Sequence, residues 1–255
     1  MPRYMPPMPA SPIPAATLVL FRDRAFAPPE LLMVERAKAM AFAGGAMVFP
    51  GGRIDPGDHL LAALHPNLPD AAARIAAIRE TVEEAGVAVA LSPPPSPGTL
   101  AELRRKLHDG EPFGRALDEA GLGLDLHALT PFARWLPAHA HARIFDTLFF
   151  LARAPVGAEA TVDETENVRL VWTTAQAMLD EVDAGRAAAI FPTRRNLERL
   201  ARFGSFDDAV ADAHAHPVRT VTPFTEVRNG AEHLCIPGDL GYPVTSEPLT
   251  AAVRG

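Results

Sequence analysis

The residues with the clearest potential for chemistry are three glutamates in the stretch RETVEEAG, which runs from position 79 to position 86. On a helix, Glu80, Glu83 and Glu84 have i,i+3 and i,i+4 spacings, at which like charges repel by roughly 0.2–0.5 kcal/mol per pair. A bound cation would offset this repulsion. Three carboxylates on one face suit hard divalent ions such as Mg²⁺ or Mn²⁺, which prefer oxygen ligands.

A helix over 70–85 would carry these glutamates on one side and an apolar stripe on the other. The stripe consists of residues at helical spacing that are expected to pack on a sheet, namely Ile75, Ile78, Val82 and Ala85. The acidic face is then expected to point away from the sheet. Alanines stand where lysines would balance its charge, and only Arg79 is spaced to pair, with Glu83. The helix alone leaves both a metal site and a solvated acidic face open.

Two glycine turns precede this helix in FPGGRIDPGD, residues 49–58. Gly51 and Gly52 allow backbone angles that turn a carbonyl oxygen toward a metal. Asp55 and Asp58 could equally be ordinary turn residues. The glycine loop and the acidic helix together predict a strand–loop–helix unit that is rich in oxygen donors.

Hydrophobic periodicity predicts an α+β fold with a mixed sheet around this unit, and proline- and glycine-rich breaks separate its elements. Two breaks, 22–29 and 92–98, are expected to be loops. The expected strands are 15–21, 30–36, 46–52, 86–91, 130–136, 144–154 and 168–172, with a hairpin over 225–236 that turns at Asn229–Gly230. The expected helices are 70–85, one or two within 99–125, 174–184, 193–203 and 205–214.

The composition is typical of a soluble globular protein, since 48% of the 255 residues are hydrophobic and 22% are charged. The net charge of −7 argues against nucleic-acid binding, and no apolar run approaches the ~20 residues that span a membrane. The proline-rich residues 1–14 are expected to form a flexible arm and not a signal peptide. The single cysteine, Cys235, favours a structural role for that residue and a cytoplasmic location.

These motifs resemble the signature of the Nudix hydrolases, which is glycine, five residues, an acid, seven residues and then Arg-Glu-apolar-x-Glu-Glu-x-Gly-apolar. RETVEEAGV (79–87) is similar to the second half, with Thr81 at an apolar position, and GRIDPGD (52–58) is similar to the first half, with Asp58 as the acid. Residues 59–78 separate the halves, a longer spacing than the usual one. This split box resembles the branch that contains the peroxisomal coenzyme A diphosphatases and related bacterial proteins.

The resemblance implies a Nudix-type α/β/α sandwich over 15–204, with a helical insertion at about 95–128. The segment 205–255 is then expected to add a helix, a hairpin and a tail packed on the same domain. The implied activity is metal-dependent hydrolysis of a diphosphate linkage in a nucleoside-diphosphate derivative. Coenzyme A or acyl-coenzyme A is the preferred substrate, ADP-ribose or another nucleotide sugar is the runner-up, and a non-catalytic nucleotide-binding module is the alternative of another class. A homodimer is possible.

The resemblance also implies roles for individual residues. Glu80 and Glu84 are expected to bind Mg²⁺ or Mn²⁺, the Gly52 carbonyl matches a position that often completes the coordination, and Glu83 is a third ligand or the base that activates water. Arg79 is expected to hold a glutamate in position. Asp58 is either a group behind the ligands or a plain turn residue.

A later loop acid supplies the base in several members of the family. Glu164 and Glu166, just before the expected strand 168–172, are the candidates here, with a solvated loop as the alternative. Arg36 is expected to contact substrate. Arg195 and Arg199 share a helix face that could meet the 3′-phosphate of coenzyme A, although an exposed basic face paired with acids is the alternative.

Overall fold

The structure, a computed structural model, describes residues 11–38, 40, 43–137, 144–162 and 167–252. Its centre is a mixed sheet in which β1 (Ile13–Arg24) runs parallel to β8 (Phe145–Arg153) and antiparallel to β2 (Ala27–Arg36). The other strands of this sheet are β3 (Met47–Val48), β4 (Gly51–Arg53), β7 (Thr130–Trp135), β9 (Asn167–Thr174) and β10 (Thr220–Val221). Their order is β10-β7-β8-β1-β2-β3, with β4 beside β1 and β9 beside β2.

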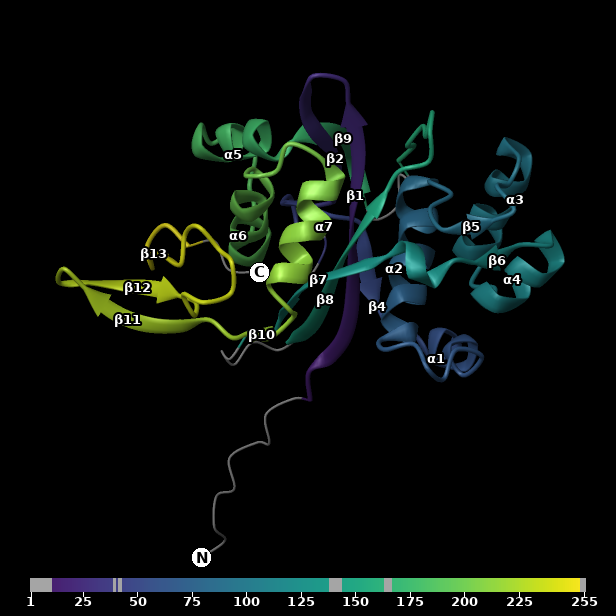
Figure 1. The fold of residues 1–255 in the computed structure, drawn as a ribbon, viewed down its shortest axis with the longest axis horizontal. Coiled ribbons are helices and arrows are strands. Elements are labelled where there is room, and N and C mark those ends of the chain that lie inside the picture. Colours follow the sequence, from purple (N-terminus) through teal and green to yellow (C-terminus); the bar gives the residue numbers. More distant parts are fainter. Residues whose placement is uncertain (1–10, 39, 41–42, 138–143, 163–166, 253–255) are drawn as a thin grey trace, which may run out of the picture.

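Helices cover both faces of this sheet (Figure 1). One layer contains α1 (Pro56–Ala62), α2 (Ala71–Ala85), α3 (Pro97–His108) and α4 (Phe113–Ala120), with the short strands β5 (Leu91–Ser92) and β6 (Gly123–Leu124) and the 3₁₀ turn η1 (Leu126–Ala128). The other layer contains α5 (Ala175–Asp183), α6 (Phe191–Leu200) and α7 (Phe206–Ala215). The predicted α+β sandwich with a mixed sheet is confirmed, with seven α-helices in the described residues.

The alternation of side chains along β1 produces a core on each side of the sheet. Leu18 and Leu20 pack into the core that contains α2, whereas Val19 and Phe21 pack into the core that contains α6 and α7. The helix α2 is therefore anchored on the sheet by its apolar stripe, as predicted.

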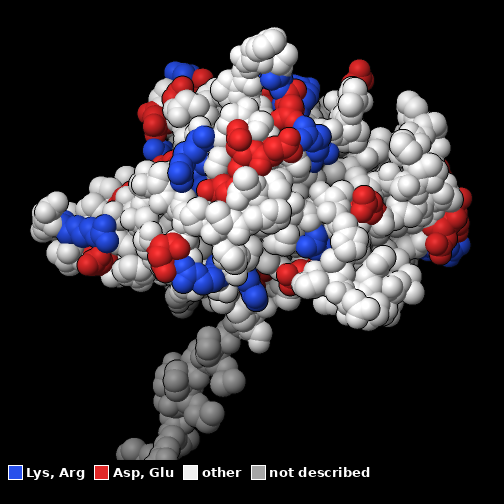
Figure 2. All heavy atoms as spheres, viewed as in Figure 1, with Lys and Arg blue, Asp and Glu red and all other residues white. Residues whose placement is uncertain are grey.

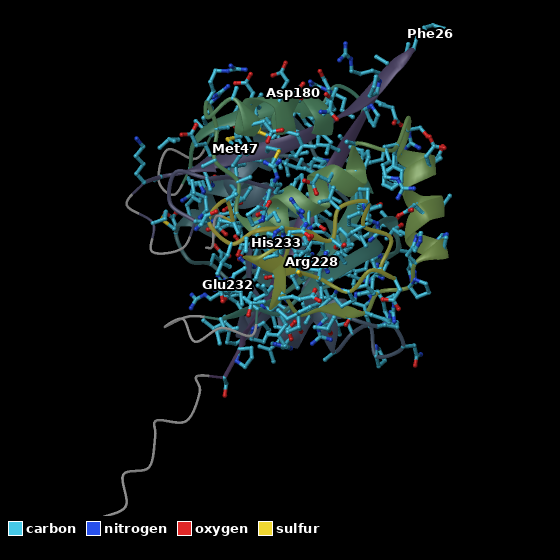
Figure 3. The ribbon with its side chains drawn as sticks, turned by 90° about the vertical axis from the view of Figure 1, so that its left-hand side faces the viewer. Phe26, Met47, Asp180, Arg228, Glu232 and His233 are labelled. Atoms are coloured by element: carbon cyan, nitrogen blue, oxygen red, sulfur yellow. The ribbon has the colours of Figure 1, made fainter. Side chains whose placement is uncertain are left out.

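The C-terminal part of the described chain forms a three-stranded sheet of β11 (Phe224–Arg228), β12 (Ala231–Cys235) and β13 (Ser246–Pro248), which projects from the body (Figure 1). The predicted hairpin is confirmed, and Asn229 and Gly230 both have positive φ, at 51° and 79°. Buried hydrogen bonds tie this segment to the sandwich: Trp135 Nε1 donates to Tyr242 Oη at 3.1 Å, and Tyr242 Oη donates to Asn196 at 2.9 Å. Figure 3, in which this hairpin faces the viewer, labels Arg228, Glu232 and His233 on it.

Three local predictions are wrong. The segment 22–29 is almost entirely strand, because Arg22 of β1 pairs with Glu30 of β2, with Arg22 Nη2 at 2.6 Å from Glu30 Oε2. The chain turns only at the tip of this hairpin, where Phe26 projects (Figure 3). Within 86–91, only Leu91 belongs to a strand. The strand β1 begins at Ile13, inside the arm predicted for 1–14, whose residues 1–10 lie outside the described part of the chain.

The surface carries acidic and basic side chains interspersed on the face that Figure 2 presents. No helix in the described ranges is both long and apolar enough to cross a membrane.

Candidate active site

A cleft of about 1040 Å³ is lined by α2, by β4 and by the segment that joins α3 to α4, together with one end of β1 and β8. Ligand pockets in proteins commonly have volumes of roughly 300–1,000 Å³, so this cleft can hold a large ligand. The residues predicted for the site that line it are Arg36, Gly52, Asp58, Arg79, Glu80, Glu83 and Glu84. Residues separated by more than forty positions in the sequence therefore meet at one cleft.

Glu84 is the most deeply buried of the three glutamates, with 3% of the residue exposed. Its carboxylate accepts a hydrogen bond from the Gly51 backbone N–H at 3.1 Å and lies 3.7 Å from Arg36 Nη1. Burial and the neighbouring Glu80 raise the pKa of Glu84 to about 8, against the lowering effect of Gly51 and Arg36. The expectation that the acidic face points away from the sheet is wrong at this residue, because Glu84 packs on the glycine strand.

Glu80 lies against the same strand, and this contact explains the glycine at position 52. A Cβ atom on Gly52 would lie 2.3 Å from Glu80 Oε1, so no larger residue fits without a shift of the glutamate. Burial raises the pKa of Glu80 to about 7 despite the lowering effect of Arg79, and the charge of Glu83 adds to the rise. Glu83 is more open, with 29% of its side chain exposed.

Arg79 joins the two halves of the box. Its Nε and Nη2 donate to the two carboxylate oxygens of Asp58 at 3.1 and 2.9 Å, while its Nη1 donates to Glu80 at 2.9 Å and lies 3.5 Å from Glu83. Burial alone would lower the pKa of Arg79. The hydrogen bonds to Asp58 and the charge of Glu80 outweigh this effect, so the pKa lies above its ordinary value and the side chain stays a cation. Asp58 is buried and also accepts the backbone N–H of Asp55 at 2.8 Å, which caps α1. Asp58 thus lies behind the glutamates and holds Arg79.

The residues that hold the C-terminal end of α2 were not predicted from the sequence. Arg104 of α3 donates to the carbonyl oxygens of Glu83 and Glu84 at 2.8 and 3.1 Å, and to the hydroxyl and carbonyl oxygens of Thr161 at 2.7 and 2.8 Å. His108 Nε2 lies 3.1 Å from the Glu83 carbonyl oxygen. Helix-end carbonyls lack intrahelical partners and carry partial negative charge, so a cation there is favourable. The insertion at 95–128 thereby holds the C-terminal end of α2 in position.

Asn167, the first residue of β9, was also missed. It is completely buried, and its side chain lies close enough to Glu84 to lower the pKa of that carboxyl group. The predicted loop acids Glu164 and Glu166 precede it in the sequence but lie outside the described residues. A lone asparagine at the edge of an acidic loop carries no pattern that would have singled it out.

The donor set at the cleft fits a hard divalent cation. In the described ranges, no three His, Cys, Asp or Glu side chains converge closely enough to hold an ion by themselves. Mg²⁺, however, is usually held by one or two carboxylates and completes its octahedron with water and substrate phosphate. Glu80 and Glu84 supply two such carboxylates, and their raised pKa values show that burial leaves their negative charge incompletely compensated. These residues therefore suit Mg²⁺ or Mn²⁺.

Arg195 and Arg199 are not at the cleft, contrary to the sequence prediction. They are 1% and 2% exposed. Arg195 Nη2 bonds Glu198 at 2.8 Å and Glu247 at 2.9 Å. Arg199 bonds Asp212 at 2.7 Å and stacks over Phe132. Because carboxylates and aromatic rings surround these guanidinium groups, a substrate phosphate has no access to them.

Comparison with known proteins agrees with the geometry. The chain matches no family model. It superimposes on the crystal structure of a NUDIX hydrolase from Alicyclobacillus acidocaldarius with a TM-score of 0.69 and 31% sequence identity, covering 79% of this chain and 96% of that one. It is also 27% identical to the human acyl-coenzyme A diphosphatase NUDT19 over 70% of its own length, and it spans 62% of that relative. This protein belongs to the Nudix hydrolase superfamily.

Proposed function

We propose that this protein hydrolyses the diphosphate linkage of coenzyme A or acyl-coenzyme A with the help of Mg²⁺ or Mn²⁺. The observation that carries the proposal is the packing of Glu80 and Glu84 of α2 against the glycine strand inside one large cleft. Membership of the superfamily supports the reaction type, and the likeness to NUDT19 supports the substrate.

Each group has a defined part in this proposal. When bound, the metal neutralises diphosphate charge and polarises the phosphorus under attack. Glu80 and Glu84 would hold it and the Gly52 carbonyl would add a ligand, while Arg79, fixed by Asp58, keeps Glu80 in place. Arg36 lines the cleft beside Glu84 and is placed to face a phosphate.

The reaction consumes one water molecule. Its oxygen bonds to one phosphorus, the bond from that phosphorus to the bridging oxygen breaks, and two phosphate monoesters form. Glu83, or one of the loop acids Glu164 and Glu166, accepts the proton of the water. Glu83 is the more exposed carboxylate of α2 and is therefore better placed than Glu84 to exchange protons with solvent.

Mass spectrometry of the products tests the proposal. Purified protein with Mg²⁺ is incubated with coenzyme A and, separately, with ADP-ribose, alongside samples without metal and samples of Glu84→Gln. Glu102→Gln is the matched control, because Glu102 is an exposed glutamate of α3 that contacts Arg105 on the helix surface.

We expect 3′,5′-ADP and phosphopantetheine, dependent on metal and on Glu84 and unaffected by the control. AMP and ribose 5-phosphate from ADP-ribose, without cleavage of coenzyme A, would replace the proposed substrate by a nucleotide sugar. No product from either compound in folded, metal-loaded protein would overturn the proposal in favour of a nucleotide-binding module.

A further inference from the structure

Acidic side chains outnumber arginines in the lining of the cleft. The described lining residues with acidic side chains are Asp55, Asp58, Glu80, Glu83, Glu84 and Glu111. The arginines of the described lining are Arg36, Arg53 and Arg79. A metal at the glutamates would neutralise a diphosphate, but coenzyme A also carries a 3′-phosphate on its ribose. A phosphate that no metal contacts needs a cationic side chain of its own in so acidic a cleft.

Arg53 differs from the other two arginines because it has no acidic partner among the described residues. Arg79 is buried and donates to Asp58 at 2.9 Å. Arg36 lies 3.7 Å from Glu84, and 15% of its side chain is exposed. Arg53 is exposed, and its guanidinium group forms no ion pair or hydrogen bond with a side chain that the structure describes. Its donors therefore remain available to an anion in the cleft.

The acidic helix itself fixes the backbone of Arg53. Arg79 Nη2 of α2 donates to the Arg53 carbonyl oxygen at 2.9 Å. On the other edge of β4, Arg53 pairs with Ala15 of β1. The next residue, Ile54, donates its N–H to the Pro14 carbonyl oxygen at 3.0 Å. The backbone at Arg53 is thus held in place relative to the glutamates of α2, while its side chain can meet a ligand.

The alternation of side chains along β4 separates Arg53 from the glutamates. Position 52 faces Glu80, since a Cβ atom on Gly52 would lie 2.3 Å from that carboxylate. Arg53 therefore points to the opposite face of the strand, which it shares with its partner Ala15 and with Thr147 beyond it. All three residues line the cleft, and the small side chain of Ala15 leaves room beside the guanidinium group. Arg53 thus lies one residue from the glutamate contact without pairing with Glu80.

We propose that Arg53 binds the 3′-phosphate of coenzyme A and thereby selects coenzyme A over dephospho-coenzyme A. This inference rests on the proposed function and adds to it a residue that determines specificity. A guanidinium group offers parallel N–H donors that match the oxygens of a phosphate. The diphosphate and the 3′-phosphate are attached to the 5′- and 3′-oxygens of one ribose, so neighbouring positions on β4 can serve both. The diphosphate then lies beside Gly52, and the 3′-phosphate lies at Arg53.

The test measures kcat/KM for coenzyme A and for dephospho-coenzyme A, which lacks only the 3′-phosphate. Arg53→Met removes the guanidinium group, and Arg53→Lys keeps the charge without the forked donors. Arg24→Met is the matched control, because Arg24 is a half-exposed arginine at the opposite end of β1 and does not line the cleft. We expect the ratio of kcat/KM for coenzyme A over dephospho-coenzyme A to fall about tenfold or more in Arg53→Met and by less in Arg53→Lys. The control should keep the wild-type ratio.

The outcomes separate this inference from the function on which it rests. A wild-type protein that cleaves both compounds equally well, or a ratio that Arg53→Met leaves unchanged, would overturn the inference and leave the diphosphatase standing. An equal loss for both substrates in Arg53→Met would also overturn it, since Arg53 would then bind a group that the two share.

If neither compound is cleaved, calorimetric titration with 3′,5′-ADP and with AMP takes the place of kinetics. Tighter binding of 3′,5′-ADP that is lost in Arg53→Met and kept in Arg24→Met would support the phosphate site without the reaction. Equal binding of the two nucleotides by the wild-type protein would overturn it.

Discussion

Arg104 Nε lies 2.8 Å from the carbonyl oxygen of Glu83, which makes the insertion helix α3 a support for the acidic helix α2. Replacement of Arg104 by Met keeps most of the side-chain volume and removes these hydrogen bonds. We expect kcat to fall by roughly 10-fold to 100-fold, because small displacements of catalytic groups are costly. Steady-state kinetics well below the unfolding temperature would measure this, with Mn²⁺ affinity as a second readout.

Arg105→Met is the control for that variant, since Arg105 only pairs with Glu102 and Asp109 on the exposed side of the same helix. Surface pairs of this kind contribute about 0–1 kcal/mol, so its kinetics should match those of the wild type. Unchanged kcat and Mn²⁺ affinity in Arg104→Met would show that Arg104 stabilises the fold without positioning the glutamates.

Glu84→Gln should reduce turnover by at least about 100-fold while the protein stays folded. Gln preserves the shape of the side chain and can still accept the Gly51 N–H, but it cannot supply a carboxylate to the metal. Calorimetric titration with Mn²⁺ and circular dichroism would separate loss of the metal from loss of the fold. Activity like that of the wild type would remove Glu84 from the site.

The metal-free protein should become less stable as the pH rises. Burial raises the pKa of Glu80 to about 7 and that of Glu84 to about 8, above the ordinary value of 4.5. The folded state then binds more protons than the unfolded state between pH 4.5 and pH 8, and this stabilisation is lost as the pH passes through the folded values.

We expect the free energy of unfolding in EDTA to fall by several kcal/mol between pH 5 and pH 8, since each pKa unit corresponds to about 1.4 kcal/mol. Mg²⁺ should reverse the fall, most strongly at pH 8, because metal binding favours the deprotonated carboxylates. Urea unfolding at several pH values measures the effect, and Glu84→Gln should flatten the profile. A metal-free stability that is independent of pH over this range would contradict the burial of charge at these two residues.

Arg195→Met should destabilise the fold without changing recognition of the 3′-phosphate of coenzyme A. The variant leaves Glu198 and Glu247 with Arg194 at 3.3 and 3.7 Å as their remaining cation, so we expect a cost below the roughly 3–5 kcal/mol that is typical when a buried pair is broken completely. Denaturant unfolding measures that cost. The ratio of KM for coenzyme A and dephospho-coenzyme A should stay at its wild-type value, and a selective rise of KM for coenzyme A would return Arg195 to the substrate site.

The acidic helix and its glycine strand could be predicted from the sequence because their pattern is local. Glu80, Glu83 and Glu84 lie within one turn, and their charge has no lysine partners nearby. The supporting residues Arg104 and Asn167 could not be predicted, because their positions beside α2 depend on how α3 and β9 pack against that helix. The prediction for Arg195 and Arg199 was wrong for the same reason, since spacing on a helix does not show which face the rest of the chain covers.

The hydrogen bond between Trp135 and Tyr242 has a consequence for biosynthesis, because it joins residues 107 positions apart. Trp135, Arg195 and Asn196 leave the ribosome before Tyr242 and Glu247. Tyr242 is the later partner of Trp135 and Asn196, and Glu247 is the later partner of Arg195. Buried polar groups without partners cost about 1–3 kcal/mol each, so the wall formed by β7 and α6 stays unfinished until these later residues are translated. A nascent chain at that stage already contains the acidic helix, but the apolar side of its cleft is open, and it is then a natural client for chaperones.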